Sequence, residues 1–487
     1  MRAICALCLI SFLLGATGCM RDMKPLLHGE NLGEIKVQAE QGHSIAQRRL
    51  AYKYSHGKGV KQNLTEAVKW YRKSAKQGDS IAQWSLAFMY EEGTGVDKNL
   101  AKAVKWYRKA AEQGDSDGQW LLGTMYMYGK GVGKKLSEAV RWFRKSAEQG
   151  NYGGQWRLGV MYEYQMGVER NFAEAAKWYR KAAEQGASDG QWRLARMYEF
   201  GNGVDKNLSE AVSWYRKAAE QGDPDAQWLL GKMYAYGFGV DQNFFEAVKW
   251  YKKSAVQGAS VGQWIISDMY KYGKGTEKNF VEAIKWARMS AEQGDSNGQW
   301  RLGVMYEYSE GVEKNLFEAV EWYKKSAEQG NSGGQWRLGN MYKFGRGVDE
   351  DINEAAKLFR KSAEQGDSGG QLRLGIVYEY GEGVEKNFAE AVKWYHRAAD
   401  QGESESQWRL GKMYKQGLGV DKNLFEAVKW FKKSAELGDF EGQWRLAIAY
   451  EFGEGVEEDI TEAVKWYRKA AAQGYGPAKK ALASLTI

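Results

Sequence analysis

The chain has 487 residues, which is too long for one compact hydrophobic core, so it either divides into domains or forms an elongated repeat structure. It contains only three prolines but 21 tryptophans, and Ala, Glu and Lys are abundant, as is typical of helical proteins. The net charge of +8 is small and both signs are interspersed, so nothing in the composition favours nucleic acid as a partner.

The first element in chain order is a predicted export signal over residues 1–18. Arg2 is followed by an uncharged, mostly apolar run from Ala3 to Leu14, and then by small residues up to Gly18. Such a stretch is too short for a permanent membrane-spanning helix, which needs about 20 residues. The pattern therefore predicts a protein that leaves the cytoplasm.

The residues directly before Cys19 resemble the lipobox of bacterial lipoproteins. The resemblance implies cleavage before Cys19, acylation of its sulfur, and a linker over residues 19–29 that begins at a lipid anchor. An aspartate after the cysteine would signal retention in the inner membrane. Met20 stands there instead, which implies an anchor in the outer membrane, with the protein facing the periplasm. Ala16 departs from the leucine usual at that position, so an ordinary cleaved signal, giving a secreted or soluble periplasmic protein, stays the alternative.

Residues 30–487 form a tandem repeat with a period of 36 residues. The pair Gln-Gly recurs at this spacing up to Gly474, with one change to Leu437-Gly438, and no insertion or deletion interrupts the series. The twelve predicted units are 43–78, 79–114, 115–150, 151–186, 187–222, 223–258, 259–294, 295–330, 331–366, 367–402, 403–438 and 439–474. The flanking stretches 30–42 and 475–487 are predicted to cap the stack. One repeated module predicts one stacked domain.

Each unit is predicted to contain two helices, which we call helix A and helix B. In the second unit, apolar residues recur with a helical period over 80–92 and again over 100–113, with Gly93 between the two stretches. Asn or Asp precedes helix B in eleven of the twelve units, Lys135 being the exception, and serves as its N-cap. A glutamate three residues later predicts a capping box.

These units resemble the Sel1-like repeats, which are relatives of the tetratricopeptide repeats. The family signature is carried, for example, by residues Gln299 to Tyr306 and Glu318 to Tyr323. The resemblance implies an all-α fold, a right-handed α-solenoid superhelix of about twelve 36-residue helix-turn-helix repeats, with helix A on the concave side and helix B on the convex side. It also implies a non-enzymatic scaffold or adaptor of protein complexes, and some bacterial members work in the cell envelope.

Two columns of side chains on helix A form the candidate binding surface. An arginine recurs at one position, and an aromatic residue follows seven residues later, on the same helix face. Arg, Trp and Tyr are frequent binding hot spots, so the columns predict a stripe that binds a protein, an extended peptide or an anionic envelope glycan. The predicted stripe comprises Arg157, Arg193, Arg301, Arg337, Arg373, Arg409 and Arg445, with Tyr164, Tyr308 and Tyr380.

The alternative for the arginines is pairing with an acidic residue one turn earlier, as between Asp189 and Arg193 or between Glu405 and Arg409, which would leave a merely solvated face. The position between arginine and aromatic residue, such as Lys412, varies most and is expected to face solvent. The tryptophan column before the arginines is expected to pack between units, with glycines such as Gly118 compensating for its volume. The Arg-Lys pairs of helix B, such as Arg108-Lys109, are expected to face outward and to pair with a glutamate three or four residues later in the same helix, such as Glu112.

Sequence motifs for catalysis or cofactor binding are weak. The Gly-x-Gly of most units lacks the preceding strand and following lysine of a phosphate loop, and the four histidines are scattered, so we expect no metal and no cofactor. Some cysteine-rich relatives have been linked to β-lactam hydrolysis, but the sole S-x-x-K, from Ser55 to Lys58, lacks companion motifs. We expect no enzyme; a cell-wall or β-lactam hydrolase stays the alternative.

A second alternative is an adaptor of a eukaryotic secretory pathway. In that case Asn63 and Asn207, each followed by a Ser or Thr two residues later, would be glycosylation sites. Both asparagines are already explained as N-caps of helix B.

Overall fold

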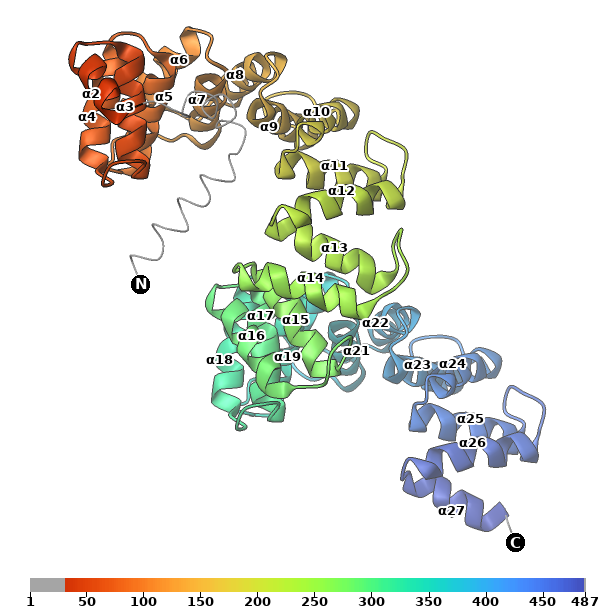
Figure 1. The fold of residues 1–487 in the computed structure, drawn as a ribbon. Helices are drawn as coiled ribbons and strands as arrows, with labels where there is room; N and C mark the ends of the chain where they lie inside the picture. Colours follow the sequence, from red (N-terminus) through yellow and green to blue (C-terminus); the bar gives the residue numbers. More distant parts are fainter. Residues whose placement is uncertain (1–30, 486–487) are drawn as a thin grey trace. The chain divides into compact units, whose positions relative to one another are not determined.

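The computed structural model describes residues 31–485, in which 26 helices and no strand occur, so the all-α prediction is confirmed. The predicted signal, the linker and Cys19 lie outside the described residues. The contacts within the chain define two compact units, residues 1–250 and 251–487, and the division falls inside helix α14. In each unit the helices are stacked in chain order (Figure 1).

Helix A and helix B alternate throughout both units. The A helices are α3 (Ser44–His56), α5 (Ser80–Glu92), α7 (Ser116–Tyr128), α9 (Tyr152–Glu163), α11 (Ser188–Phe200), α13 (Pro224–Tyr236), α15 (Ser260–Tyr272), α17 (Ser296–Tyr308), α19 (Ser332–Lys343), α21 (Ser368–Tyr380), α23 (Ser404–Gln416) and α25 (Phe440–Phe452). The B helices are α4 (Leu64–Lys76), α6 (Leu100–Glu112), α8 (Leu136–Glu148), α10 (Phe172–Glu184), α12 (Leu208–Glu220), α14 (Phe244–Val256), α16 (Phe280–Glu292), α18 (Leu316–Glu328), α20 (Ile352–Glu364), α22 (Phe388–Asp400), α24 (Leu424–Glu436) and α26 (Ile460–Ala472). Helix α2 (Leu32–Glu40) precedes the first pair and α27 (Gly476–Leu485) follows the last.

The N-caps of helix B lie where the sequence predicts them. Asn63 Oδ1 accepts the backbone N–H of Glu66 at 3.1 Å, whereas Lys135 makes no side-chain cap. The capping-box prediction is wrong in its second half. The N–H of Asn63 donates to the carbonyl oxygen of Tyr54 in the preceding helix at 2.9 Å, and Glu66 pairs with Lys69 at 3.3 Å. The glutamate therefore belongs to the exposed face of helix B and not to its cap.

The Gln-Gly signature connects neighbouring repeats through a ladder of glutamines. Gln113, just before the glycine, donates its Nε2 to Oε1 of Gln83 at 2.8 Å, and Gln83 donates to the carbonyl oxygen of Ala75 at 3.2 Å. Ala75 lies in the last turn of the preceding helix B, where carbonyl groups lack partners within the helix. A buried glutamine of one repeat thus donates a hydrogen bond to a carbonyl oxygen in the last turn of the preceding repeat's helix B.

Glycines inside helix A allow the helices to approach closely. A Cβ atom on Gly118 would lie 2.6 Å from Cβ of Ala110 in the preceding helix B, and one on Gly154 would lie 2.5 Å from Oγ of Ser146. The expectation that these glycines compensate for the volume of tryptophan is therefore wrong. Their role is the packing of α7 on α6 and of α9 on α8.

The Arg-Lys pairs of helix B also differ from expectation. Arg108 Nη2 donates to the hydroxyl of Tyr126 in the next helix A at 2.7 Å, and Nζ of Lys109 lies 4.7 Å from the ring centroid of Trp106. The prediction that these side chains pair with glutamates of their own helix is wrong. They connect repeats and cover the tryptophan of helix B.

Helix A lines the concave side of the stack in each unit. Consecutive A helices contact one another, as α5 does with α7 and α19 with α21, whereas within residues 31–485 no two consecutive B helices make a comparable contact. A stack whose A helices lie closer together than its B helices must curve toward helix A. Residues on the open face of helix A therefore face the hollow of each unit.

A buried tyrosine of helix B donates to a glutamate of helix A in several repeats. The hydroxyl of Tyr107 lies 3.0 Å from Glu91 Oε2, and that of Tyr179 lies 2.6 Å from Glu163 Oε2. Burial, and then the charge of the nearby glutamate, raise the pKa of Tyr107 well above its ordinary value. The same two causes act on Tyr215 through Glu199.

We therefore expect the protein to lose stability steeply above pH 10. The tyrosine pKa is about 10 in the unfolded chain and higher in the fold, so the stabilisation is complete below pH 10 and is lost as the pH rises through the folded-state pKa. The measurement is an alkaline titration followed both by tyrosinate absorbance and by far-ultraviolet circular dichroism. The buried tyrosines should ionise together with the loss of helix; full ionisation with helix retained would contradict this expectation.

Candidate partner-binding face

The aromatic residues near the ends of the A helices are exposed. Their exposed fractions lie between 47% and 65%, and Tyr164, Tyr308 and Tyr380, the predicted site residues, are among them. We call this set the aromatic column: Tyr128, Tyr164, Phe200 and Tyr236 in unit 1, and Tyr272, Tyr308, Phe344, Tyr380 and Phe452 in unit 2. An exposed aromatic side chain in repeat after repeat, on the helices that line the concave side, is typical of a contact surface.

The arginine column, by contrast, is largely buried against tryptophan. The guanidinium carbon of Arg193 lies 4.1 Å from the ring centroid of Trp192 and 5.3 Å from that of Trp156 in the preceding repeat. Arg301 lies in the same way between Trp300 and Trp264, with its side chain 14% exposed. The tryptophans thus pack between repeats, as expected, and hold the guanidinium planes between them.

Four of the seven predicted arginines are already neutralised inside the protein. The shortest ion pairs are Arg301 with Asp268 at 2.7 Å, Arg337 with Glu307 at 3.4 Å, Arg409 with Glu405 at 2.9 Å and Arg445 with Glu441 at 3.1 Å. The alternative of pairing one turn earlier is therefore confirmed for Arg409 and Arg445. The ion pairs of Arg301, Arg337 and Arg409 connect neighbouring repeats, that of Arg445 lies within α25, and all four guanidinium groups are less available to a partner.

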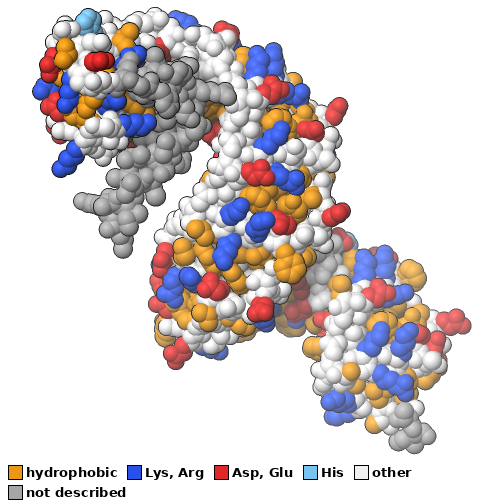
Figure 2. All heavy atoms as spheres, in the orientation of Figure 1, with side chains coloured by type: hydrophobic (Ala, Val, Ile, Leu, Met, Phe, Trp, Pro, Cys, Tyr) orange, Lys and Arg blue, Asp and Glu red, His pale blue; other side chains and the backbone are white. Residues whose placement is uncertain are grey.

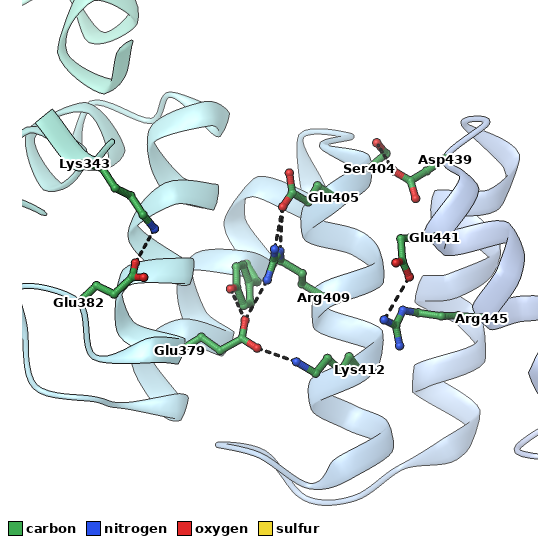
Figure 3. Close-up of polar contacts among 11 residues, drawn as sticks. Lys343, Glu379, Glu382, Ser404, Glu405, Arg409, Lys412, Asp439, Glu441 and Arg445 are labelled. Carbon is green, nitrogen blue, oxygen red and sulfur yellow. Dashed lines mark hydrogen bonds and ion pairs between the residues drawn. The ribbon is translucent and has the colours of Figure 1, made fainter. Parts of the chain in front are cut away.

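Glu379 is the centre of the densest such network (Figure 3). Its carboxylate accepts from Tyr395 Oη at 2.6 Å, from Lys412 Nζ at 2.8 Å and from Arg409 Nη1 at 3.2 Å. Burial alone would raise the pKa of Glu379, but the hydrogen bonds from Lys412 and Tyr395 and the nearby cations outweigh it and lower the pKa. The network joins α21, α22 and α23.

The expectation that the position of Lys412 faces solvent is wrong. The corresponding residue of another repeat, Lys232, pairs with Glu199 of the preceding repeat at 2.8 Å, and Asp268 pairs with Arg301 of the next. Where this position is charged, as in Lys232, Asp268 and Lys412, the side chain pairs with a residue of a neighbouring repeat.

Charges alternate along unit 2 in a column that sequence reasoning missed. The residue directly before the aromatic column is Lys271, Glu307, Lys343, Glu379, Lys415 and Glu451 in successive repeats. Ion pairs connect Lys271 with Glu310 at 2.8 Å and Glu307 with Arg346 at 3.1 Å, and also Lys415 with Glu454. Figure 3 shows the corresponding pair of Lys343 with Glu382. In each pair the partner lies in the turn of the next repeat. The alternation of lysine and glutamate at a spacing of 36 residues is visible in the sequence and could have revealed this column.

The other three arginines have no such partner. Within residues 31–485, no carboxylate lies within ion-pair distance of Arg157, Arg193 or Arg373, and the buried Nε atoms of Arg157 and Arg193 lack hydrogen-bond partners. On the face in view, Figure 2 shows cationic, anionic and hydrophobic side chains interspersed, without a block of one charge. The seven arginines therefore differ in whether a carboxylate of the chain lies next to them, and not in the overall charge of the surface around them.

The serine of the S-x-x-K motif does not contact the lysine of that motif; its Oγ atom lies 2.7 Å from Nδ1 of His56. Ser55 donates to the carbonyl oxygen of Tyr52 at 2.9 Å, and Lys58 donates to the hydroxyl of Tyr52, so the lysine is not directed at the serine. No group of three His, Cys, Asp or Glu side chains in residues 31–485 is arranged to hold a metal ion. None of the helices in that range combines the length and apolar character that crossing a membrane requires.

Comparisons with known proteins agree on the repeat. The family model described as Sel1 repeat matches residues 44–79, 80–115, 116–151, 153–186, 188–223, 224–258, 260–295, 296–331, 332–367, 368–403, 404–439 and 440–475. No curated protein shows significant similarity to the chain.

Solved structures show the same repeat. A protective antigen present in uropathogenic Escherichia coli strains, described as displaying an SLR fold, is 37% identical over 93% of this chain and 97% of its own, with a TM-score of 0.67. A Sel1 repeat protein from Oxalobacter formigenes is 34% identical over 50% of this chain and 96% of its own, with a TM-score of 0.46.

Proposed function

This chain belongs to the Sel1 repeat family, whose members are generally scaffolds of protein interactions and typically non-catalytic, and we propose that it holds partner proteins of the bacterial cell envelope on the face lined by helix A. The proposed contact residues are the aromatic column and those arginines that lack a carboxylate partner within the chain. The proposal includes no reaction and no cofactor.

The exposure of the aromatic column carries the proposal. Removing one such side chain from water contributes roughly 1.5–3 kcal/mol, so several neighbouring aromatic residues suffice for a stable complex after the cost of association is subtracted. Exposed tyrosines such as Tyr164 and Tyr308 also offer a hydroxyl for hydrogen bonds to a partner. A row of this kind would be an aggregation hazard if nothing covered it.

Replacing three consecutive members of the aromatic column with serine should weaken partner binding at least ten-fold. The variant is Tyr272→Ser, Tyr308→Ser and Phe344→Ser, which removes apolar contact area and leaves the buried helix packing in place. Quantitative pull-down from envelope fractions measures the effect. Phe317→Ser is the matched control, because Phe317 is 73% exposed but lies on helix B. Unchanged capture by the triple variant would contradict the proposal.

We also propose that Cys19 anchors the protein to the outer membrane. The apolar run of the signal and the lipobox-like residues before Cys19 support this location. The E. coli relative is described as a protective antigen, which fits a protein outside the cytoplasm. Fractionation of cells that express Cys19→Ser tests the anchor: the variant should leave the membrane fraction, and a variant that stays there would refute the lipid anchor.

A further inference from the structure

Two neighbouring arginines of the column in unit 1, Arg157 and Arg193, lack the ion pairs that most arginines of the column form in unit 2. In unit 2, Arg409 meets a carboxylate 30 residues earlier, Glu379, and another four residues earlier, Glu405. Arg301 meets one 33 residues earlier, Asp268. For Arg157 of unit 1, the three corresponding positions are Met127, Gly153 and Thr124, none of which is acidic. The repeats around α9 thus leave Arg157 without the ion pair that Arg301 and Arg409 form, although the charge of Asp189 attracts both Arg157 and Arg193 from beyond ion-pair distance.

Arg193 in the next repeat is in a similar situation although acids occupy its neighbouring positions. The carboxylate of Glu163 accepts the hydroxyl of Tyr179 at 2.6 Å, and neither Glu163 nor Asp189 lies within ion-pair distance of Arg193. The Nε atoms of Arg157 and Arg193 are buried without a partner. Burial lowers the pKa of Arg157; the hydroxyl of Tyr128 and the charge of Asp189 act against this effect, and the charge of Arg193 adds to it. The two guanidinium groups therefore lie close enough to repel each other.

Their surroundings are preorganised for a ligand. The guanidinium carbon of Arg157 lies 4.3 Å from the ring centroid of Trp156 and 5.4 Å from that of Trp120, so stacking fixes its plane. Arg196 donates to the hydroxyl of Tyr164 at 3.4 Å. A guanidinium group with a fixed plane loses little side-chain entropy when it forms two parallel hydrogen bonds to a carboxylate.

We propose that Arg157, Arg193 and Arg196, with Tyr128 and Tyr164, bind the carboxylate side chains of an extended acidic segment of a partner protein. The proposal rests on the proposed function and assigns the acidic contacts to unit 1. An extended segment alternates its side chains, so acidic residues can reach the arginines while apolar residues between them contact Tyr128 and Tyr164, which are 56% and 47% exposed. Charge complementarity and the exposed aromatic rings together favour such a segment over a small anion.

The test uses the purified full chain and two fluorescent ten-residue peptides, one alternating glutamate with leucine and one alternating lysine with leucine. Fluorescence anisotropy should show binding of the glutamate peptide, weakening in 0.5 M salt, and no binding of the lysine peptide. The variant Arg157→Gln with Arg193→Gln should weaken binding of the glutamate peptide at least ten-fold. Arg141→Gln is the matched control in the same unit, because its side chain is 59% exposed on helix B (α8). Circular dichroism establishes that each variant is folded.

Several results would overturn the proposal. Equal binding of both peptides, or equal affinity of the double variant and the native chain, removes the role of the arginines. If oligogalacturonate displaces the glutamate peptide at a lower concentration than unlabelled peptide does, the ligand is an anionic glycan. If millimolar inorganic phosphate displaces the peptide, the arginines form a small-anion site. If the arginine variant keeps its affinity while the aromatic variant of unit 2 loses partner capture, only this proposal fails; if neither changes capture, the proposed function fails too.

Discussion

Replacing Gly375 with valine should lower the free energy of unfolding by about 3 kcal/mol, the upper part of the range for overpacked cores. A Cβ atom at Gly375 would lie 2.5 Å from Cε1 of Tyr395, which is fully buried and donates its hydroxyl to Glu379. Valine adds two methyl groups to this Cβ atom, and the ring of Tyr395 cannot make room for them without breaking that hydrogen bond, so α21 and α22 must separate. Urea denaturation followed by circular dichroism measures the loss.

The matched control is Gly375→Ala. In the last complete repeat, Ala447 occupies the corresponding position and is fully buried, and Tyr467 corresponds to Tyr395. A single methyl group therefore fits after a small shift, and we expect a loss below about 1 kcal/mol. A valine variant as stable as the alanine variant would show that the close approach of the two helices is not required.

Replacing Glu379 with glutamine should cost about 2–3 kcal/mol at pH 7. Removing one partner of a fully buried ion pair costs about 3–5 kcal/mol, and the value is reduced here because Lys412 and Arg409 keep some contact with water. Their side chains are 25% and 14% exposed. Glu454→Gln is the control, because its pair with Lys415 is 36% exposed on both sides, and we expect at most about 0.5 kcal/mol there.

The loss caused by Glu379→Gln should disappear in acid. The pKa of Glu379 is lowered in the fold, so its stabilisation is present above the unfolded-state pKa, about 4.3, and is lost as the pH falls through the folded-state pKa. Denaturation of both proteins at several pH values from 7 to 2.5 measures the difference. A difference that is constant over this range would show that the charge of Glu379 contributes nothing to the effect.

Much of the fold follows from the sequence because the repeat is uninterrupted. Each period contains its own helix signals: an N-cap such as Asn63, a glycine such as Gly93 at the end of helix A, and apolar positions at helical spacing. These signals act over a few residues. The resemblance to the repeat family predicts how the helix pairs stack on one another, which local sequence patterns alone do not predict.

The contacts between repeats were not predictable by the same means. Glu379 meets Lys412, 33 residues later, and Lys343 meets Glu382, 39 residues later, and these offsets depend on how one repeat is rotated onto the next. The exposure of the aromatic column could be predicted because it depends only on where each residue lies on its own helix. Pairing within one helix, as between Arg409 and Glu405, was predictable, but the partners of Arg301 and Arg337 come from another repeat and were not.

The most direct test of the central claim compares one concave and one convex position in the same repeat. A photo-crosslinking benzoylphenylalanine replaces either Tyr308 on α17 or Phe317 on α18, both of which are exposed aromatic side chains, 54% and 73%. After irradiation in cells, the account predicts a specific protein adduct from Tyr308 and none from Phe317. An adduct from Phe317 alone would place the partner on helix B and contradict the account.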